Sequence, residues 1–293
     1  MPSEGIYLLS NVGFSGKEKP LLLAQNNDNF IDIYPYGHTF TLFFDLNQRF
    51  CTGWRNIETG ERFTCPHNQE IDQKYEQCNQ CQKRTGFNPA FYHASSVSPQ
   101  QEARNKEPHI LYLAYFGQNL TKVGISHAKR GNGRLLEQGA RTALILDTLA
   151  TAHIARHYEA KIAKLSGFVE TVQLRKKLSL LLANYDSEQA ANELMAVKAS
   201  IETSLGVTFN DARLLHLDGT YFPNGTPDLS SAHDTSNNNL ISGTCIGQAG
   251  SILLCEQDNS IFCLPLKKYV GYRMTISNAT QTIDTPARQT SLF

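Results

Sequence analysis

The sequence lacks several features that would assign its class at once. No run of apolar residues is long enough to cross a bilayer, and residues 1–14 have neither the basic start nor the apolar stretch of a secretory signal. The sequence has no internal repeat, no low-complexity tract, no glycine-rich nucleotide-binding loop and no serine or cysteine hydrolase motif. We therefore expect a cytoplasmic protein without membrane association.

The composition is that of an ordinary globular protein, with 41% hydrophobic and 10% aromatic residues. A length of 293 residues leaves room for two or three domains. The seven cysteines are an odd number and follow no export signal, so they indicate metal ligation and free thiols rather than a disulfide framework.

Charge is distributed unevenly along the chain. The 27 basic and 27 acidic residues cancel overall, but residues 101–180 carry thirteen Lys/Arg against six Asp/Glu. A neutral protein with one basic segment suits contact with a polyanion through a single face. A solvated helix face would show the same pattern, so this signal is weak by itself.

The pattern predicts an α+β fold, in which a small antiparallel sheet with flanking helices lies between a zinc-binding β region and a small carboxyl-terminal β domain. We expect a β-rich, cysteine-rich region, a sheet-and-helix domain, a helical connector, a small β domain and a flexible tail, at 1–95, 106–170, 171–205, 206–276 and 277–293. The polar segment 95–108 contains two prolines and predicts a linker.

Within these regions, the residue patterns predict individual elements. Two short strands are expected around a turn in 32–44, and a hairpin in 110–126, where ILYLAYF and LTKVGIS flank a turn. A helix is expected at 151–166, and a helix or helix pair at 171–204 with its break at 184–186. Residues 257–260 predict a hairpin turn between carboxyl-terminal strands.

Four cysteines have the chemistry of a structural zinc site: Cys51, Cys65, Cys78 and Cys81. The C-x2-C spacing of the last pair is typical of a zinc knuckle, and four thiolates close a tetrahedral Zn²⁺ shell. His67 could replace Cys51 as a ligand, and His93 is a further candidate. The other three cysteines lie in apolar β segments and predict buried thiols: Cys245, Cys255 and Cys263.

Glu159 is the carboxylate whose position asks for an explanation. Its neighbours one helical turn away include Ala155 and Ile162, so it shares the apolar stripe of its helix. A carboxylate on that stripe needs a cation, a metal or a strong hydrogen bond. Arg134, at the start of the preceding helix, is one candidate partner, and a divalent metal bound to phosphate is another.

The segment 109–165 resembles the GIY-YIG nuclease superfamily. Ile110-Leu111-Tyr112 stands where that family has Gly-Ile-Tyr, Lys122-Val123-Gly124 stands where it has Tyr-Ile-Gly, and the likeness continues through Arg134 to Glu159. The resemblance implies a small three-stranded antiparallel sheet with flanking helices, and metal-dependent hydrolysis of a phosphodiester. Lysine in place of the second tyrosine is similar to the phage-type branch of the superfamily.

The resemblance also implies roles for individual residues. Glu159 would hold Mg²⁺ or Mn²⁺, Arg134 would stabilise charge on the phosphoryl oxygens, and Tyr112 would activate or orient the attacking water. Lys122 would act as a base or as a phosphate contact. The residues expected to contact nucleic acid are Gly124, His127, Lys129 and Arg130. Taken singly, Tyr112 is also typical of a core residue, and Arg134 with Glu159 of a plain ion pair.

A wider resemblance covers most of the chain. The stretch from Lys122-Val123-Gly124-Ile125-Ser126 to the RLLEQGA segment at 134–140, with Gly247-Gln248 and Gly271-Tyr272, resembles the bacterial domain-of-unknown-function family 2797. That family joins a cysteine-rich amino-terminal region to a GIY-YIG-like core and a small β segment. It brings no established activity.

The last five residues, Q-T-S-L-F, resemble peptides that dock on bacterial sliding clamps. Leu292 and Phe293 would anchor in an apolar pocket while the Gln289 amide sets the register by hydrogen bonds. The alternative is that Leu292 and Phe293 pack against the last strand.

These observations favour a metal-dependent nuclease, acting on DNA rather than RNA, in repair, recombination or defence linked to the sliding clamp. The alternative is a non-catalytic, zinc-containing nucleic-acid-binding adaptor with a GIY-YIG-like platform. A third class, an enzyme acting on a nucleotide or tRNA, stays open because nothing in the sequence distinguishes DNA from RNA.

Overall fold

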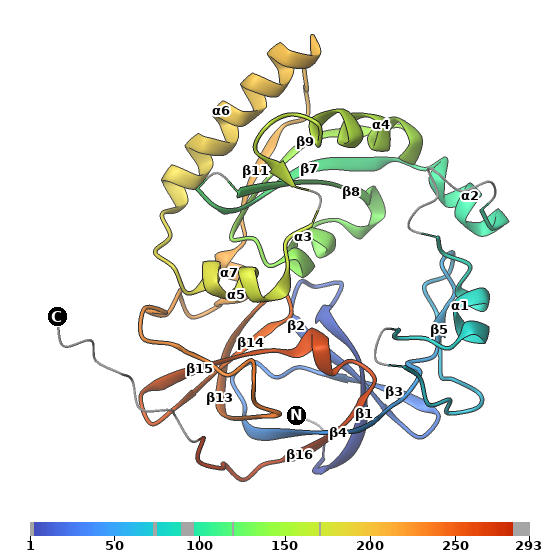
Figure 1. Ribbon diagram of the computed structural model, residues 1–293, viewed down its shortest axis with the longest axis vertical. Coiled ribbons are helices and arrows are strands. Elements are labelled where there is room, and N and C mark those ends of the chain that lie inside the picture. The colour runs from blue at the N-terminus through green and yellow to red at the C-terminus, as the bar shows by residue number, and fades with distance from the viewer. Residues whose placement is uncertain (1–2, 73–74, 89–96, 119, 170, 284–293) are drawn as a thin grey trace.

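The computed structural model describes residues 3–72, 75–88, 97–118, 120–169 and 171–283. They form a mixed α/β structure with a nine-stranded sheet, a five-stranded sheet and a small two-stranded hairpin. In Figure 1 the nine-stranded sheet fills the lower half, where blue and red strands lie together, and the five-stranded sheet lies above it. None of the helices in the described ranges is long and apolar enough to cross a membrane.

The nine-stranded sheet is built from both ends of the chain. Its order is β12-β15-β14-β13-β4-β16-β1-β2-β3. The strands span β1 Gly5–Phe14, β2 Pro20–Asn26, β3 Asn29–Ile33, β4 Thr39–Arg49, β12 His233–Asp234, β13 Leu240–Ala249, β14 Ile252–Gln257, β15 Ser260–Pro265 and β16 Tyr272–Ser277. The expected amino-terminal β region and carboxyl-terminal β domain thus share one sheet. Strand β4 pairs with β13 on one side and β16 on the other, so the two regions form one layer.

Alternation of side chains along these strands creates the first core. In β16 every second residue is buried, beginning with Tyr272, and β4 buries Phe40, Leu42 and Phe44 completely. Residues from β1 to β4 and from β13 to β16 meet in a single apolar cluster, so the sheet curls around it. The predicted turn at 257–260 is confirmed, because Asp258 and Asn259 have positive φ angles of 50° and 60° between β14 and β15.

The five-stranded sheet has the order β10-β8-β7-β9-β11. Its strands are β7 His109–Gly117, β8 Leu120–His127, β9 Thr142–Leu149, β10 Phe168–Val169 and β11 Arg213–His216. The predicted hairpin in 110–126 is confirmed as β7 and β8. Strand β7 lies in the centre and is buried from His109 to Phe116, because both faces of the sheet are covered.

Helices cover the two faces of this sheet. In the described residues the helices are α1 Asn79–Thr85, α2 Pro99–Asn105, α3 Gly133–Gln138, α4 Ala152–Ile162, α5 Leu174–Leu181, α6 Ser187–Leu205 and α7 Asp218–Tyr221, and those from α3 to α7 pack on this sheet. The apolar sides of α4 and α6 pack on the outer face, and those of α3, α5 and α7 lie between the two sheets. The helix expected at 151–166 and the helix pair with a break near 184–186 are confirmed as α4, α5 and α6.

The predicted linker at 95–108 was wrong, because it contains α2. Ser98 caps this helix by accepting from the Gln101 amide nitrogen at 3.2 Å, and Pro99 occupies the first turn, where its missing N–H costs nothing. The fully buried Gln101 side chain bonds both the amide nitrogen and the carbonyl of Asn88, at 2.8 and 2.7 Å. The proline that suggested a linker therefore starts a docked helix.

The two sheets meet in a shared second core, where Leu254 and Cys263 of the large sheet pack with residues of α3, α5 and β7. Backbones approach closely at Gly250, where an added Cβ would lie 2.9 Å from the Gly139 Cα. Gly139 ends α3 with φ 79°, and Gly250 has φ 61° in the β13–β14 turn. This glycine contact sets the distance between the layers.

We expect Gly250→Ala to lower the free energy of unfolding by about 2–4 kcal/mol, since it combines a left-handed backbone with overpacking. The matched control is Gly206→Ala, at φ 63° with nothing within 4 Å of the added Cβ, which should cost about 1 kcal/mol. Urea unfolding followed by circular dichroism measures both. Equal losses in the two variants would show that the Gly139–Gly250 contact does not matter.

Candidate functional site

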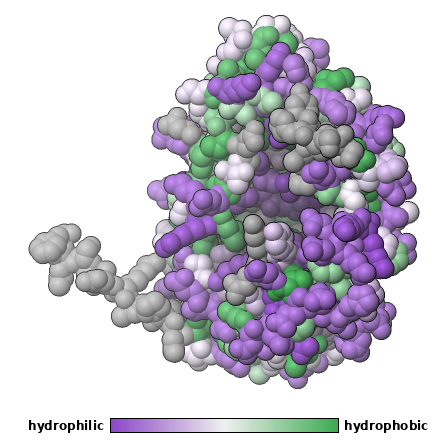
Figure 2. All heavy atoms as spheres, turned by 45° about the vertical axis from the view of Figure 1, so that its right-hand side comes forward, coloured by the Kyte–Doolittle hydropathy of each residue, from purple (hydrophilic) through white to green (hydrophobic). Residues whose placement is uncertain are grey.

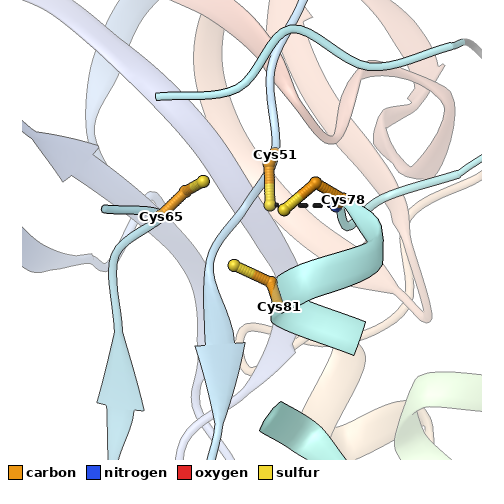
Figure 3. A group of neighbouring side chains, drawn as sticks. All are labelled: Cys51, Cys65, Cys78 and Cys81. Carbon is orange, nitrogen blue, oxygen red and sulfur yellow. Dashed lines mark hydrogen bonds between the residues drawn. The ribbon is translucent and has the colours of Figure 1, made fainter. Parts of the chain in front are cut away.

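The four predicted metal ligands come together. Their sulfur atoms all lie within 4.8 Å of one another, and Figure 3 shows them pointing into a common space. Cys51 follows β4, Cys65 follows the hairpin of β5 Trp54–Arg55 and β6 Arg62–Phe63, and Cys78 and Cys81 lie at the start of α1. In the first turn of a helix, residues three positions apart lie on the same face, which explains the C-x2-C spacing of Cys78 and Cys81. His67 is exposed and lies outside the cluster, and His93 lies outside the described residues.

The electrostatics of the cluster fit a shared cation. The Cys78 amide donates to Cys51 Sγ at 3.2 Å. Burial raises the pKa of Cys51 to about 11 and that of Cys81 further. Burial also acts to raise the pKa of Cys78, but hydrogen bonds from the Cys81 backbone and from the neighbouring thiols lower it to about 7. Thiols this close compete for protons, and a metal ion at their centre would replace those protons.

The donor set fits zinc. Four sulfur ligands are typical of closed tetrahedral Zn²⁺ sites, where Zn–S bonds of about 2.3 Å place sulfurs about 3.8 Å apart. The observed maximum of 4.8 Å needs only a small contraction. The other cysteines are buried in strands as predicted, with Cys245 opposite Cys255 and Cys263 in the core between the sheets.

A second group of residues surrounds Gly124. Tyr112 on β7 lies across from Gly124 on β8, and a Cβ there would lie 2.5 Å from the Tyr112 hydroxyl. Only glycine leaves room for the tyrosine ring. Tyr112 is 1% exposed, and burial raises its pKa, an effect that the positive charge of Arg134 opposes.

Two arginines and one glutamate lie at the solvent side of this group. Glu137 of α3 accepts from Arg130 at 2.6 Å and lies 3.5 Å from Arg134. The Arg134 side chain remains 41% exposed. The guanidinium groups are therefore anchored but accessible to an anion.

Glu159 extends from α4 and is 5% exposed. Its carboxylate forms an ion pair with Arg156, one turn earlier in the same helix, and it also raises the pKa of Tyr112. The sequence analysis considered Arg134 as its partner, and the closest partner is instead local. Arg134 and Glu159 nevertheless both lie within electrostatic range of Tyr112.

Lysines add positive charge to the same region. Lys122 of β8 is 8% exposed. Lys177 of α5 donates to the Gln138 carbonyl at 2.6 Å, and burial, with the charges of Lys122 and Arg134, lowers its pKa to about 8. The sequence analysis did not identify Lys177 as a site residue, because Lys177 comes near Lys122 and Arg134 only when α5 packs against the five-stranded sheet.

The predicted nucleic-acid contacts divide into two kinds. Gly124 and His127 are buried, whereas Lys129 and Arg130 are exposed. His127 donates to Glu107 at 2.7 Å and accepts from the Lys129 amide at 3.2 Å, and burial lowers its pKa, which favours the neutral ring. It holds the 3-10 turn η1 Ala128–Arg130, which presents Lys129 and Arg130 to solvent.

A groove of about 1420 Å³ borders this turn. Figure 2 shows a hollow between the upper and lower halves of one face, with mainly hydrophilic residues around it. Besides Lys129, Arg130 and Glu137, its lining includes charged and aromatic residues of the large sheet and the β5–β6 hairpin: Lys17, Glu18, Lys19, Phe30, Asp32, Tyr34, Tyr36, Arg55 and Arg62. The sequence analysis missed this groove, although alternation in residues 30–34 could have indicated an outward aromatic face.

Comparison with known proteins gives one match. A family model described as "Protein of unknown function (DUF2797)" matches residues 37–274, which is most of the chain. No curated protein and no solved structure matches. The wider resemblance seen in the sequence is confirmed, and the likeness to GIY-YIG nucleases stays a prediction.

We expect one zinc ion per chain in the wild-type protein. Cys81→Ser should lose this ion and should unfold at a much lower temperature, because the ion links segments that have little core of their own. The control is Cys263→Ser, which changes an equally buried thiol outside the cluster. Metal analysis by mass spectrometry and thermal unfolding measure both effects. Full zinc content in Cys81→Ser would contradict the assignment.

Proposed function

The chain belongs to the DUF2797 family, and we propose that it is a metal-dependent nuclease that holds a phosphodiester of nucleic acid beside Arg134. One observation carries the proposal: Tyr112 packs on Gly124, and Arg134 and Glu159, from two other elements, lie close enough for their charges to act on its hydroxyl. DNA is the proposed substrate in preference to RNA.

The order of elements supports a GIY-YIG-like core. Antiparallel strands β8, β7 and β9 are adjacent, with β7 in the middle, and the chain runs through β7, β8, α3, β9 and α4. This matches the three-stranded antiparallel sheet with flanking helices that the resemblance implies. Tyr112 is then on the first strand, Arg134 on the first helix and Glu159 on the second.

The residues suit hydrolysis of a phosphodiester. Arg134, partly exposed and close enough to Tyr112 for its charge to act on that hydroxyl, can bind a phosphoryl oxygen where negative charge grows. Lys122 and Lys177 add positive charge behind it. A Mg²⁺ or Mn²⁺ ion, held by Glu159 and by the phosphate of the substrate, would supply Lewis-acid chemistry. Tyr112 would orient the attacking water through its hydroxyl.

The burial of these groups favours a second candidate, a non-catalytic nucleic-acid-binding adaptor. Tyr112 and Glu159 are 1% and 5% exposed, and Glu159 is paired with Arg156. For catalysis, Glu159 must give up part of this ion pair to a metal. In the adaptor, Arg130 and Arg134 bind phosphates and the buried groups only support the fold.

The carboxyl-terminal peptide gives the proposal a partner. Gln289, Leu292 and Phe293 lie outside the described residues, so their proposed binding to a bacterial sliding clamp rests on the sequence alone. A peptide of residues 286–293 should bind purified clamp with a Kd in the micromolar range, because a short motif buries little area. The Leu292→Ala, Phe293→Ala double variant should not bind, and equal binding of both peptides would exclude the motif.

We expect cleavage of at least one substrate in a panel of single-stranded, double-stranded, branched and RNA molecules, with Mg²⁺ or Mn²⁺ present. Glu159→Gln and Arg134→Lys should each lower the rate about a hundredfold or more, since each removes a group that stabilises developing charge. Gel analysis of labelled substrates measures the rates.

Arg175→Ala, an exposed arginine on α5 outside the site, is the control and should cleave at the wild-type rate. Melting temperatures of the variants show whether they fold. Binding without cleavage in the wild type would favour the adaptor. Cleavage by Glu159→Gln at the wild-type rate would place the activity elsewhere.

A further inference from the structure

We propose that the groove beside η1 binds a single strand of nucleic acid, with bases stacked on aromatic rings of the nine-stranded sheet. The inference rests on the proposed function in one respect: the strand bound in the groove would be the substrate that reaches Arg134. The aromatic floor of the groove and one of its walls come from the large sheet and the cysteine-rich hairpin, outside the GIY-YIG-like segment.

The floor of the groove is the outer face of the β1–β3 edge of the sheet. Ile31 and Ile33 of β3 pack on the curled core, so the alternating residues Phe30, Asp32 and Tyr34 point the other way. The β1–β2 turn at one side carries Lys17 and Lys19, which are exposed. Turn η1, the first turn of α3 and residues 219–223 form the opposite wall.

The walls carry more positive than negative charge. Six Lys/Arg and three Asp/Glu line the groove. One of these carboxylates, Glu137, already binds Arg130 and Arg134. The excess positive charge therefore favours an anionic ligand.

The arginines also crowd one another. Burial, followed by repulsion from Arg55, lowers the pKa of Arg62. Arg104 of α2, which donates to the Ile57 carbonyl at 2.9 Å, has its pKa lowered by burial and then by Arg130 and Arg55. Arginines of the β5–β6 hairpin, α2 and η1 thus lie within electrostatic range of one another, and phosphates bound near them would relieve the repulsion.

The aromatic floor distinguishes a single strand from a duplex. Tyr34 is 41% exposed, and Phe30 and Tyr36 are partly exposed beside the apolar Leu21 and Leu23. Unpaired bases stack on such rings, whereas a duplex hides the faces of its bases and offers only phosphates to the walls. The volume of about 1420 Å³ exceeds the roughly 300–1,000 Å³ of small-molecule pockets and suits several nucleotides.

The groove connects the two candidate sites. Arg55 and Arg62 belong to the hairpin between Cys51 and Cys65, where Trp54 stacks on Phe63 with ring centres 4.2 Å apart. At the other wall, Arg130 and Glu137 contact each other and lead to Arg134. A strand in the groove would therefore pass from the cysteine module to Arg134.

The test is fluorescence anisotropy of labelled oligothymidylate, oligouridylate and a DNA duplex of equal length, without added Mg²⁺. Tyr34→Ala should weaken single-strand binding roughly tenfold or more and leave duplex binding unchanged. Lys129→Gln should lower the slope of log K against log salt by roughly 0.7. The two single strands distinguish a DNA from an RNA ligand, and either supports the groove.

The matched control is Phe43→Ala, because Phe43 is also 41% exposed but lies on β4 outside the groove. Lys176→Gln, an exposed lysine on α5, controls for Lys129. Equal effects of Tyr34→Ala and Phe43→Ala, or a duplex that binds as tightly as a single strand, would overturn the inference.

The readout is binding, so it separates the two proposals. If Tyr34→Ala cleaves at the wild-type rate and binds single strands as the wild type does, the nuclease proposal would stand and strand binding in the groove would be excluded. If the wild type cleaves no substrate and Tyr34→Ala loses single-strand binding, the result would support binding in the groove and exclude the nuclease proposal.

Discussion

The pairing of β4 with β13 on one side and β16 on the other is the constraint on which the rest of the structure depends. The hydroxyls of Thr41 and Ser242 hydrogen-bond at 2.8 Å across the first of these pairs, although about two hundred positions separate them in the chain. Pairing over such distances closes a very long loop, and its entropic cost must be offset by the curled apolar core. Once β4 is paired, everything between it and β12 is held at both ends by one sheet.

The two candidate sites follow from that anchoring. Cys51 comes directly after β4, so the cysteine cluster holds the chain where it leaves the large sheet. Its hairpin is thereby directed toward the β1–β3 edge, with Arg55 and Arg62 in the groove. The five-stranded sheet is placed by the Gly139–Gly250 contact and by the Tyr221 hydroxyl, which donates to the carbonyls of Leu136 and Ala140 at 3.1 and 3.0 Å. These contacts position α3, and with it Arg130 and Arg134, opposite the same groove.

Charge and burial have different roles at the two ends of the site. Tyr112 and Glu159 are enclosed, and each lies near an arginine, Arg134 for Tyr112 and Arg156 for Glu159. The groove has the opposite character, since its arginines repel each other and its rings are exposed. Arg134 joins them because its charge acts on Tyr112 on the inner side and it reaches Glu137 on the outer side.

The sequence by itself determined the features that depend on near neighbours. The β7–β8 hairpin, the turn at Asp258 and Asn259, the helix that carries Glu159 and the cysteine pair at the start of α1 are all read from short patterns, because turn chemistry and side-chain periodicity act over a few residues. Only the tertiary structure decided that both chain ends share one sheet, that α2 docks through Gln101, that Gly124 and His127 are buried, and that a groove forms between β3 and η1. These depend on pairing and packing between segments far apart in the chain, and the residues of each segment carry no local signal of the partner that they meet.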